Sequence, residues 1–147
     1  MGAEPYYYLV PYEDDLNAAL QKLREREFQA GRYNPAMPML TFPINDGSPA
    51  PGCQHDSIEE ALAEAEADGT RSILDIYRIG DAPDFCTAGP LSDERLEELF
   101  GTTQPTIEMI EESGEFFDDI DRGMCVYIIA YKDGQPDQIY FAGYSFD

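Results

Sequence analysis

The segment MCVYIIAYKDGQPDQIYFAGYSF, residues 124–146, decides the fold class of this chain. It begins and ends with runs of β-branched and aromatic residues, which fit a pleated strand. Between these runs lie the turn-forming residues KDGQP, 132–136. We therefore expect a C-terminal β-hairpin with strands over 124–131 and 138–146.

The register of this hairpin determines which side chains share a face of the sheet. If Lys132 pairs with Asp137, Ile128 lies beside Phe141 and one face is aliphatic and small. The opposite face is mostly tyrosine, and we expect it either to be covered inside the fold or to be part of a recognition surface. That tyrosine face comprises Tyr127, Ile129, Tyr131, Tyr140, Ala142, Tyr144 and Phe146.

The rest of the chain carries the usual start, periodicity and stop signals of helices and strands. Asp14 or Asp15 caps a first helix that Gly31 ends, and Ser57 with Glu60 forms the capping box of a second. In chain order, the expected elements are an edge strand over 6–10, a helix between 16 and 31, a long loop over 33–52 in which 39–42 allows a short strand, a helix between 57 and 69, a buried central strand over 72–79, and helices between 92 and 101 and between 103 and 114.

This order of elements predicts one α+β domain over 1–147. Its sheet is expected to be mainly antiparallel with about four strands, and about four helices are expected to pack on the aliphatic face. No internal repeat or sharp change of composition divides the chain.

The charge of the chain excludes two classes of partner. Thirty acidic residues against nine Lys and Arg give a formal charge of −21 over 147 residues. Such a charge repels nucleic-acid phosphates and anionic membranes, so we expect neither as a partner. The longest uncharged apolar run, 124–131, is far shorter than the roughly 20 residues that span a bilayer, and the first residues lack a signal-peptide pattern. Three cysteines without paired spacing fit reduced thiols, so a soluble cytoplasmic protein is expected.

No catalytic, metal or cofactor motif is found. Cys53 and His55 have the residue types of a thiolate–base pair or a zinc site, but the chain has one histidine and no further ligands at suitable spacing. Asp118 and Gly123 match the first and sixth positions of a calcium loop, whereas Ile129 stands where the bidentate carboxylate belongs. We therefore assign no catalytic residue, no metal site and no cofactor.

Two runs of the chain carry acidic residues without a basic one, six within 56–68 and seven within 108–121. A solvated face that keeps the protein soluble is the ordinary interpretation. A charge of −21 on one small domain, however, costs stability through self-repulsion, and a surface of one sign steers association with a partner of the opposite sign. The residues predicted to bind such a partner are Glu111, Glu112, Asp118, Asp119, Tyr127, Tyr140 and Tyr144.

The leading hypothesis is therefore a non-enzymatic acidic module that binds a basic protein. In size, acidity and lack of a catalytic motif the chain resembles the inhibitor and immunity proteins that bacteria direct against basic toxins, and proteins that mimic nucleic-acid charge. The alternative is a small-molecule binding domain or minor enzyme in which the loop over 34–52 acts as a lid, and a carboxylate-based metal protein is a third interpretation. The oligomeric state is left open.

Overall fold

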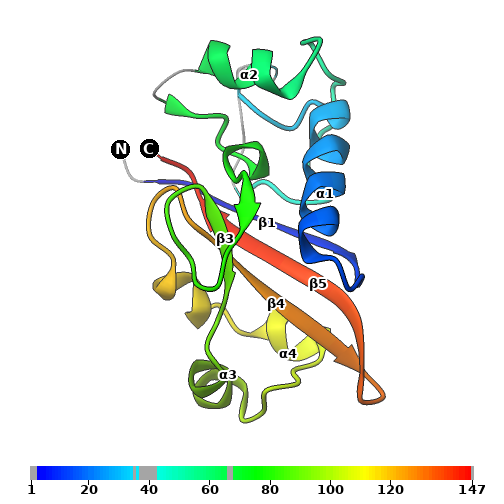
Figure 1. The fold of residues 1–147 in the computed structure, drawn as a ribbon, viewed down its shortest axis with the longest axis vertical. Helices are drawn as coiled ribbons and strands as arrows, with labels where there is room; N and C mark the ends of the chain where they lie inside the picture. The colour runs from blue at the N-terminus through cyan, green and yellow to red at the C-terminus, as the bar shows by residue number, and fades with distance from the viewer. Residues whose placement is uncertain (1–2, 35, 37–42, 66–67, 147) are drawn as a thin grey trace.

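The strands form one mixed sheet of five, where the sequence predicts about four strands in a mainly antiparallel sheet. The strand order is β1-β5-β4-β3-β2; β5 is antiparallel to β1 and β4, whereas β3 is parallel to β4 and β2 (Figure 1). The strands are β1 (Pro5–Pro11), β2 (Arg78–Ile79), β3 (Thr87–Pro90), β4 (Cys125–Lys132) and β5 (Gln135–Tyr144). The computed structural model describes residues 3–34, 36, 43–65 and 68–146, so the short strand expected over 39–42 lies outside the described residues.

The predicted hairpin is confirmed as β4 and β5, but its predicted register is wrong. Asp133 and Gly134 both have positive φ, 53° and 77°, as a tight two-residue hairpin turn requires. Lys132 therefore pairs with Gln135, and a bulge after Ala130 shifts the pairing by one residue. As a result Ile128 lies opposite Tyr140 instead of Phe141.

This change of register divides the predicted tyrosine face between the two faces of the sheet. Tyr127 lies opposite Phe141 and packs with it on one face. Tyr140 and Tyr144 lie on the other face, in the cluster that contains Ile128. A single tyrosine face is therefore not formed.

The buried central strand predicted over 72–79 is also wrong. Ile73–Asp75 forms the 3-10 helix η2, and β2, which follows it, is a two-residue strand at the edge of the sheet. The Ser72 hydroxyl accepts a hydrogen bond from the Leu74 amide (3.2 Å), and the carboxylate of Asp75 accepts one from the Thr70 amide (2.8 Å). These local side-chain bonds satisfy backbone amides that a strand would have paired across a sheet.

Strand β3 has no signal in the sequence, because Ala, Gly and Pro are poor strand residues. Its place is fixed by tertiary contacts: Ala88 lies opposite Cys125 of β4. Gly89 is required there, since a Cβ atom would lie 2.1 Å from the carbonyl carbon of Ala82.

The predicted helices are present, and their capping residues are largely as expected. Asp15 caps the first helix by accepting from the Ala18 amide (3.0 Å), and Gly31 ends it in the left-handed region. Ser92 and Gly101 bound the third in the same way. The helices are α1 (Leu16–Ala30), α2 (Ile58–Ala65), α3 (Asp93–Phe100) and α4 (Ile107–Glu112), with a further 3-10 helix η3 (Glu115–Asp119).

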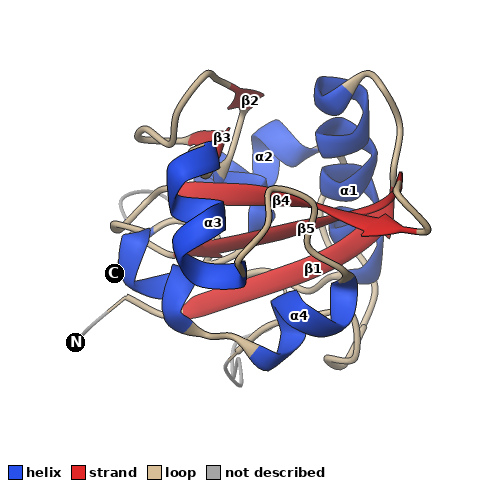
Figure 2. Cartoon of the chain, turned by 90° about the horizontal axis from the view of Figure 1, so that it is seen from below, coloured by secondary structure: helices blue, strands red, loops and turns tan. Residues whose placement is uncertain are grey.

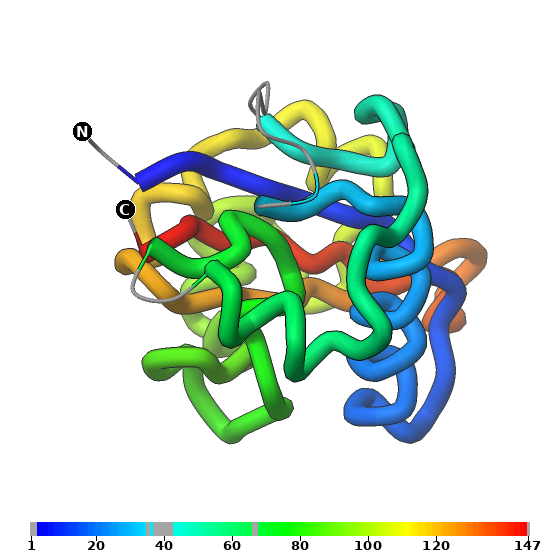
Figure 3. Tube along the Cα trace, turned by 90° about the horizontal axis from the view of Figure 1, so that it is seen from above, coloured from blue at the N-terminus to red at the C-terminus, as the bar shows by residue number. Residues whose placement is uncertain are grey.

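Helices cover both faces of the sheet, although they were expected on one. In Figure 2, α3 and α4 lie in front of the strands and α1 and α2 behind them; in Figure 3, from the opposite side, α1 and α2 lie in front. Leu20 and Leu23 of α1 pack against Tyr8 and Phe141. The other face packs against α3, α4 and η3, and α2 joins the end of α1 in a third, smaller cluster. The sheet therefore separates a 91–121 segment from the rest of the chain.

Candidate partner-binding surface

Residues 91–121 contain α3, α4 and η3 and form one layer over one face of the sheet, which we call the acidic layer. It contains eleven acidic residues and one basic residue, Arg95. All eleven are exposed. They are Asp93, Glu94, Glu97, Glu98, Glu108, Glu111, Glu112, Glu115, Asp118, Asp119 and Asp121.

Apolar side chains at helical spacing turn these carboxylates outward. Ile110 of α4 and Phe116 of η3 are completely buried, and Leu96 and Leu99 of α3 pack against the same cluster. Each short helix therefore has one face on Val126 and its neighbours in the sheet, while its acidic residues lie on the solvent side.

The one basic residue of the layer is held within it and changes its formal charge only from −11 to −10. The Arg95 guanidinium donates to both carboxylate oxygens of Asp119, at 2.7 and 3.1 Å, and to Glu98 at 3.1 Å. The hydrogen bonds to Asp119 and then to Glu98 raise the pKa of Arg95 above its usual value. Asp119, predicted to bind a partner, is thus a link between α3 and η3. No ion pair is found for the other nine acidic residues within the described part of the chain.

A groove between α3 and α4 is lined by both apolar and acidic side chains. Its apolar lining residues are Leu99, Phe100 and Met109, its acidic ones are Glu112 and Glu115, and its volume is about 350 Å³. Met109 is 38% exposed, which is unusual for a large apolar side chain in this structure. Such a groove suits the aliphatic stem and charged end of a lysine or arginine side chain.

The structure brings some predicted site residues together and separates others. Glu111 and Tyr140 line one pocket, of about 220 Å³. Asp118 and Tyr144 line another hollow, of about 290 Å³, and both belong to the same side of the sheet. Tyr127 does not join them, since it packs on the α1 face.

Tyr140 is mostly enclosed. Its side chain is 6% exposed, its ring stacks on that of Tyr7 with centroids 5.8 Å apart, and its edge meets Phe116. Burial raises the pKa of Tyr140 well above its usual value, and the charges around Tyr7, Glu111 and Asp46 raise it further. The hydroxyl is therefore neutral at physiological pH.

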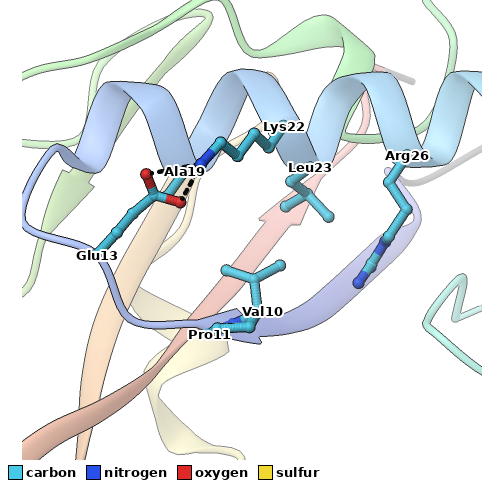
Figure 4. Close-up of a pocket in the computed structure, with 7 residues that line it drawn as sticks. All are labelled: Val10, Pro11, Glu13, Ala19, Lys22, Leu23 and Arg26. Carbon is cyan, nitrogen blue, oxygen red and sulfur yellow. Dashed lines mark hydrogen bonds and ion pairs between the residues drawn. The ribbon is translucent and has the colours of Figure 1, made fainter.

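A separate cavity of about 370 Å³ lies between α1 and the end of β1 (Figure 4). The two cationic side chains that line this cavity already have anionic partners. Lys22 contacts both carboxylate oxygens of Glu13 at 3.1 Å, and Arg26 pairs with Asp46. The described residues of the loop over 34–52 do not line this cavity, whereas Asn45 and Asp46 of that loop line the pocket of Tyr140.

The Cys53–His55 pair forms neither of the arrangements considered from sequence. His55 lies between two other side chains: its Nδ1 is 2.7 Å from the Tyr33 hydroxyl, and its Nε2 contacts the Glu64 carboxylate. The Cys53 thiol is exposed and points to the side-chain oxygen of Gln29 (3.7 Å). Among the described residues, no three or more His, Cys, Asp or Glu side chains are grouped to hold a metal ion.

No protein-family model matches the chain, and neither a curated protein nor a solved structure is significantly similar to it. Within the described ranges, none of the helices has the length and apolar character needed to cross a bilayer.

The predicted residues identify only part of this surface. The helix α3 was predicted, but its acidic residues were not assigned to this surface, because Arg95 interrupts their run. Tyr7 and Asp46 were also missed, because they come from distant segments. Helix α2, which contains the described middle part of the acidic run over 56–68, lies on the other side of the sheet. The acidic density of α3 is the signal that would have extended the prediction.

Proposed function

We propose that this protein is a non-enzymatic binding module whose acidic layer captures a basic protein. The observation that carries the proposal is the placement of eleven exposed carboxylates and one internally paired arginine on a single side of the sheet. An inhibitor or immunity-type role, in which binding blocks a basic enzyme or toxin, fits the size and acidity of the chain.

The distribution of the basic residues supports this proposal. At least five of the nine have partners inside the fold, and four of these five lie outside the acidic layer, so they do not neutralise its carboxylates. Arg26 and Arg32 pair with the buried Glu27, for example, at 3.0 and 2.7 Å. The other three are Lys22, Arg24 and Arg95.

Association with a basic protein would relieve the self-repulsion of the layer. Nine carboxylates without an ion-pair partner in the described structure repel one another in the free protein, and opposite charges on a partner remove that cost. The electric field of the acidic layer also increases the rate at which the protein and a basic partner meet, because this field acts over about 10 Å at 0.1 M ionic strength.

The test compares two variants with the same number of neutralised charges. In the first, Glu97, Glu108, Glu112 and Asp118 of the acidic layer are changed to Gln or Asn; in the second, Asp56, Glu59, Glu60 and Asp68 near α2 are changed likewise. Each immobilised protein is exposed to extract of its native cell at low salt, and bound proteins are eluted with salt and identified.

We expect the unchanged protein and the α2 variant to retain a basic protein that the acidic-layer variant loses. When this basic protein is purified, it should bind the unchanged protein and the α2 variant in solution with similar affinity. It should bind the acidic-layer variant more weakly. Equal capture by both variants, or capture of a partner without a basic surface, would overturn the proposal.

A further inference from the structure

A pocket beside the acidic layer has the chemistry of a receptor for one cationic side chain. We call it the Tyr140 pocket; β1 contributes Tyr7, β5 contributes Tyr140, α4 contributes Glu111 and the loop contributes Asn45 and Asp46. Its volume is about 220 Å³, which suits a single side chain and not a helix or strand. Four segments far apart in sequence thus meet around one small hollow.

Among the described residues, no hydrogen bond to the Tyr140 hydroxyl is found. More than nine-tenths of this side chain is buried, and the residue lines the pocket. The hydroxyls of Tyr6 and Tyr8 are also without a partner among the described residues, but both side chains are buried in the core cluster on the other face of the sheet. A ligand in the pocket would give the Tyr140 hydroxyl the partner it lacks.

The remaining polar groups of the pocket make it rich in acceptors. Asp46 is held in place, because one of its oxygens accepts from the Leu9 amide (3.0 Å) and the other pairs with Arg26. Glu111 is exposed and has no ion pair within the described residues. The charge of Asp46 is thus compensated and that of Glu111 is not, so the pocket is net negative.

The walls also suit the alkyl stem of a basic side chain. The rings of Tyr7 and Tyr140 are nearly parallel, 12° apart, and form a rigid apolar wall. The Tyr7 hydroxyl is fixed by a hydrogen bond from the Asn45 amide group (3.1 Å). An extended lysine or arginine can therefore lay its methylenes on the rings and keep its charged end beside the carboxylate.

We propose that the Tyr140 pocket receives a lysine or arginine side chain of the basic partner, whose cationic end lies between the Glu111 carboxylate and the Tyr140 hydroxyl. This inference rests on the proposed function. The acidic layer attracts the partner over a distance, and the pocket fixes one of its side chains in place. Desolvated anchors of this kind provide most of the affinity of protein interfaces.

The experiment follows backbone amide chemical shifts by NMR while small probes are added to the full chain. The probes are N-acetyl-arginine methylamide and N-acetyl-lysine methylamide, with uncharged N-acetyl-norleucine methylamide as the control for the alkyl stem. We expect the two cations to shift the amides of Leu9, Asp46, Glu111 and Tyr140, and the control to leave them unchanged.

Two variants and a matched control locate the site. Glu111→Gln should weaken cation binding about threefold, the effect of removing one exposed ion pair. Tyr140→Phe should also weaken it, and Glu59→Gln, at an exposed position of α2 outside the acidic layer, should leave it unchanged. Because Glu111 is exposed, its variant keeps the test valid even if Tyr140→Phe does not fold.

Shifts spread evenly over the acidic layer, or equal weakening by Glu59→Gln, would overturn the pocket as a specific receptor. So would the absence of any cation-dependent shift at these four amides. If the acidic-layer variant still loses its basic partner in that case, the pocket is rejected and the proposed function stands. If the acidic-layer variant retains the basic partner, both the pocket and the proposed function are rejected.

Discussion

Asp75 is a carboxyl group buried for a structural purpose. It is 1% exposed, and its oxygens accept from the amide and hydroxyl of Thr70 at 2.8 and 2.9 Å and from the Arg71 amide at 3.2 Å. Arg71 itself has a positive φ of 57°, an uncommon conformation that these bonds hold in place. Despite the hydrogen bonds, burial raises the pKa of Asp75 to about 6.

This raised pKa predicts a specific dependence of stability on pH. The folded protein binds a proton at Asp75 below pH 6, whereas the unfolded chain binds one only near pH 4. The stability contributed by protonation is therefore complete below pH 4 and is lost as pH rises through 6. We expect the free energy of unfolding in urea to fall between pH 4.5 and 7, by up to about 2 kcal/mol from this group.

The Asp75→Asn variant tests the assignment. It removes the titration, so the dependence on pH should become shallower, while the control Asp81→Asn, at an exposed position, should keep the wild-type slope. An Asp75→Asn variant with the wild-type slope would show that other carboxyl groups cause the dependence.

At the scale of elements, the two-residue turn of the β4–β5 hairpin and the bulge after Ala130 together fix the register of these strands. Gly134 has a φ of 77°, which costs a residue with a side chain about 1 kcal/mol. We expect Gly134→Ala to lower the free energy of unfolding by about that amount in urea denaturation. Gly114, with a φ of −122° and open space around it, is the matched control, and Gly114→Ala should cost much less. Equal losses at both positions would contradict the role of the turn.

The contact of Arg95 with Asp119 joins α3 to η3 across the acidic layer. Arg95→Gln removes this link and leaves two more unpaired carboxylates, so we expect a lower melting temperature and a larger increase of that temperature with added salt. Arg78→Gln also removes one positive charge, but outside the layer, and serves as the control. A melting temperature that responds equally to both variants would show that only net charge matters.

Local signals predicted the elements well and their pairing poorly. The caps at Asp15 and Ser92 and the hairpin depend on residues within a few positions of one another, so the sequence contains the whole signal. The pairing of β3 depends on contacts with a distant strand, and its sequence, TAGP, has no strand pattern. No pattern around Ser72 indicates the 3-10 helix η2 either. The predicted register of the β4–β5 hairpin was wrong because its turn is only two residues long and a bulge after Ala130 then shifts the pairing by one residue.

The candidate site divides in the same way. The exposure of the acidic residues over 108–121 could be predicted, because apolar residues that pack on the sheet recur among them. The acidic residues between these apolar positions must then face solvent. The Tyr140 pocket could not, since Tyr7 and Asp46 reach it only after β1 pairs with β5 and the loop returns along the edge of the sheet.

At the scale of the whole molecule, the balance of charge predicts how salt affects stability. Thirty acidic residues cannot be matched by nine basic ones, so repulsion outweighs attraction and screening should stabilise the fold. We expect the melting temperature at pH 7 to rise between 10 and 200 mM sodium chloride, and the acidic-layer variant with four neutralised carboxylates to show a smaller rise. A melting temperature that falls steadily with salt would show that local ion pairs dominate.

The same charge governs the rate at which the protein meets its basic partner. Reversal of Glu111, Glu112 and Asp118 to lysine should slow association strongly at low ionic strength and change dissociation less, because steering acts before contact. Asp119 is left unchanged, since its reversal would break the pair with Arg95 and confuse steering with folding. Stopped-flow measurements of the captured partner between 20 and 300 mM salt should show a steep fall of the association rate for the unchanged protein and a shallow one for the variant. Circular dichroism must show that both are folded, and association rates that do not differ at any salt concentration would mean that the acidic layer does not steer the partner.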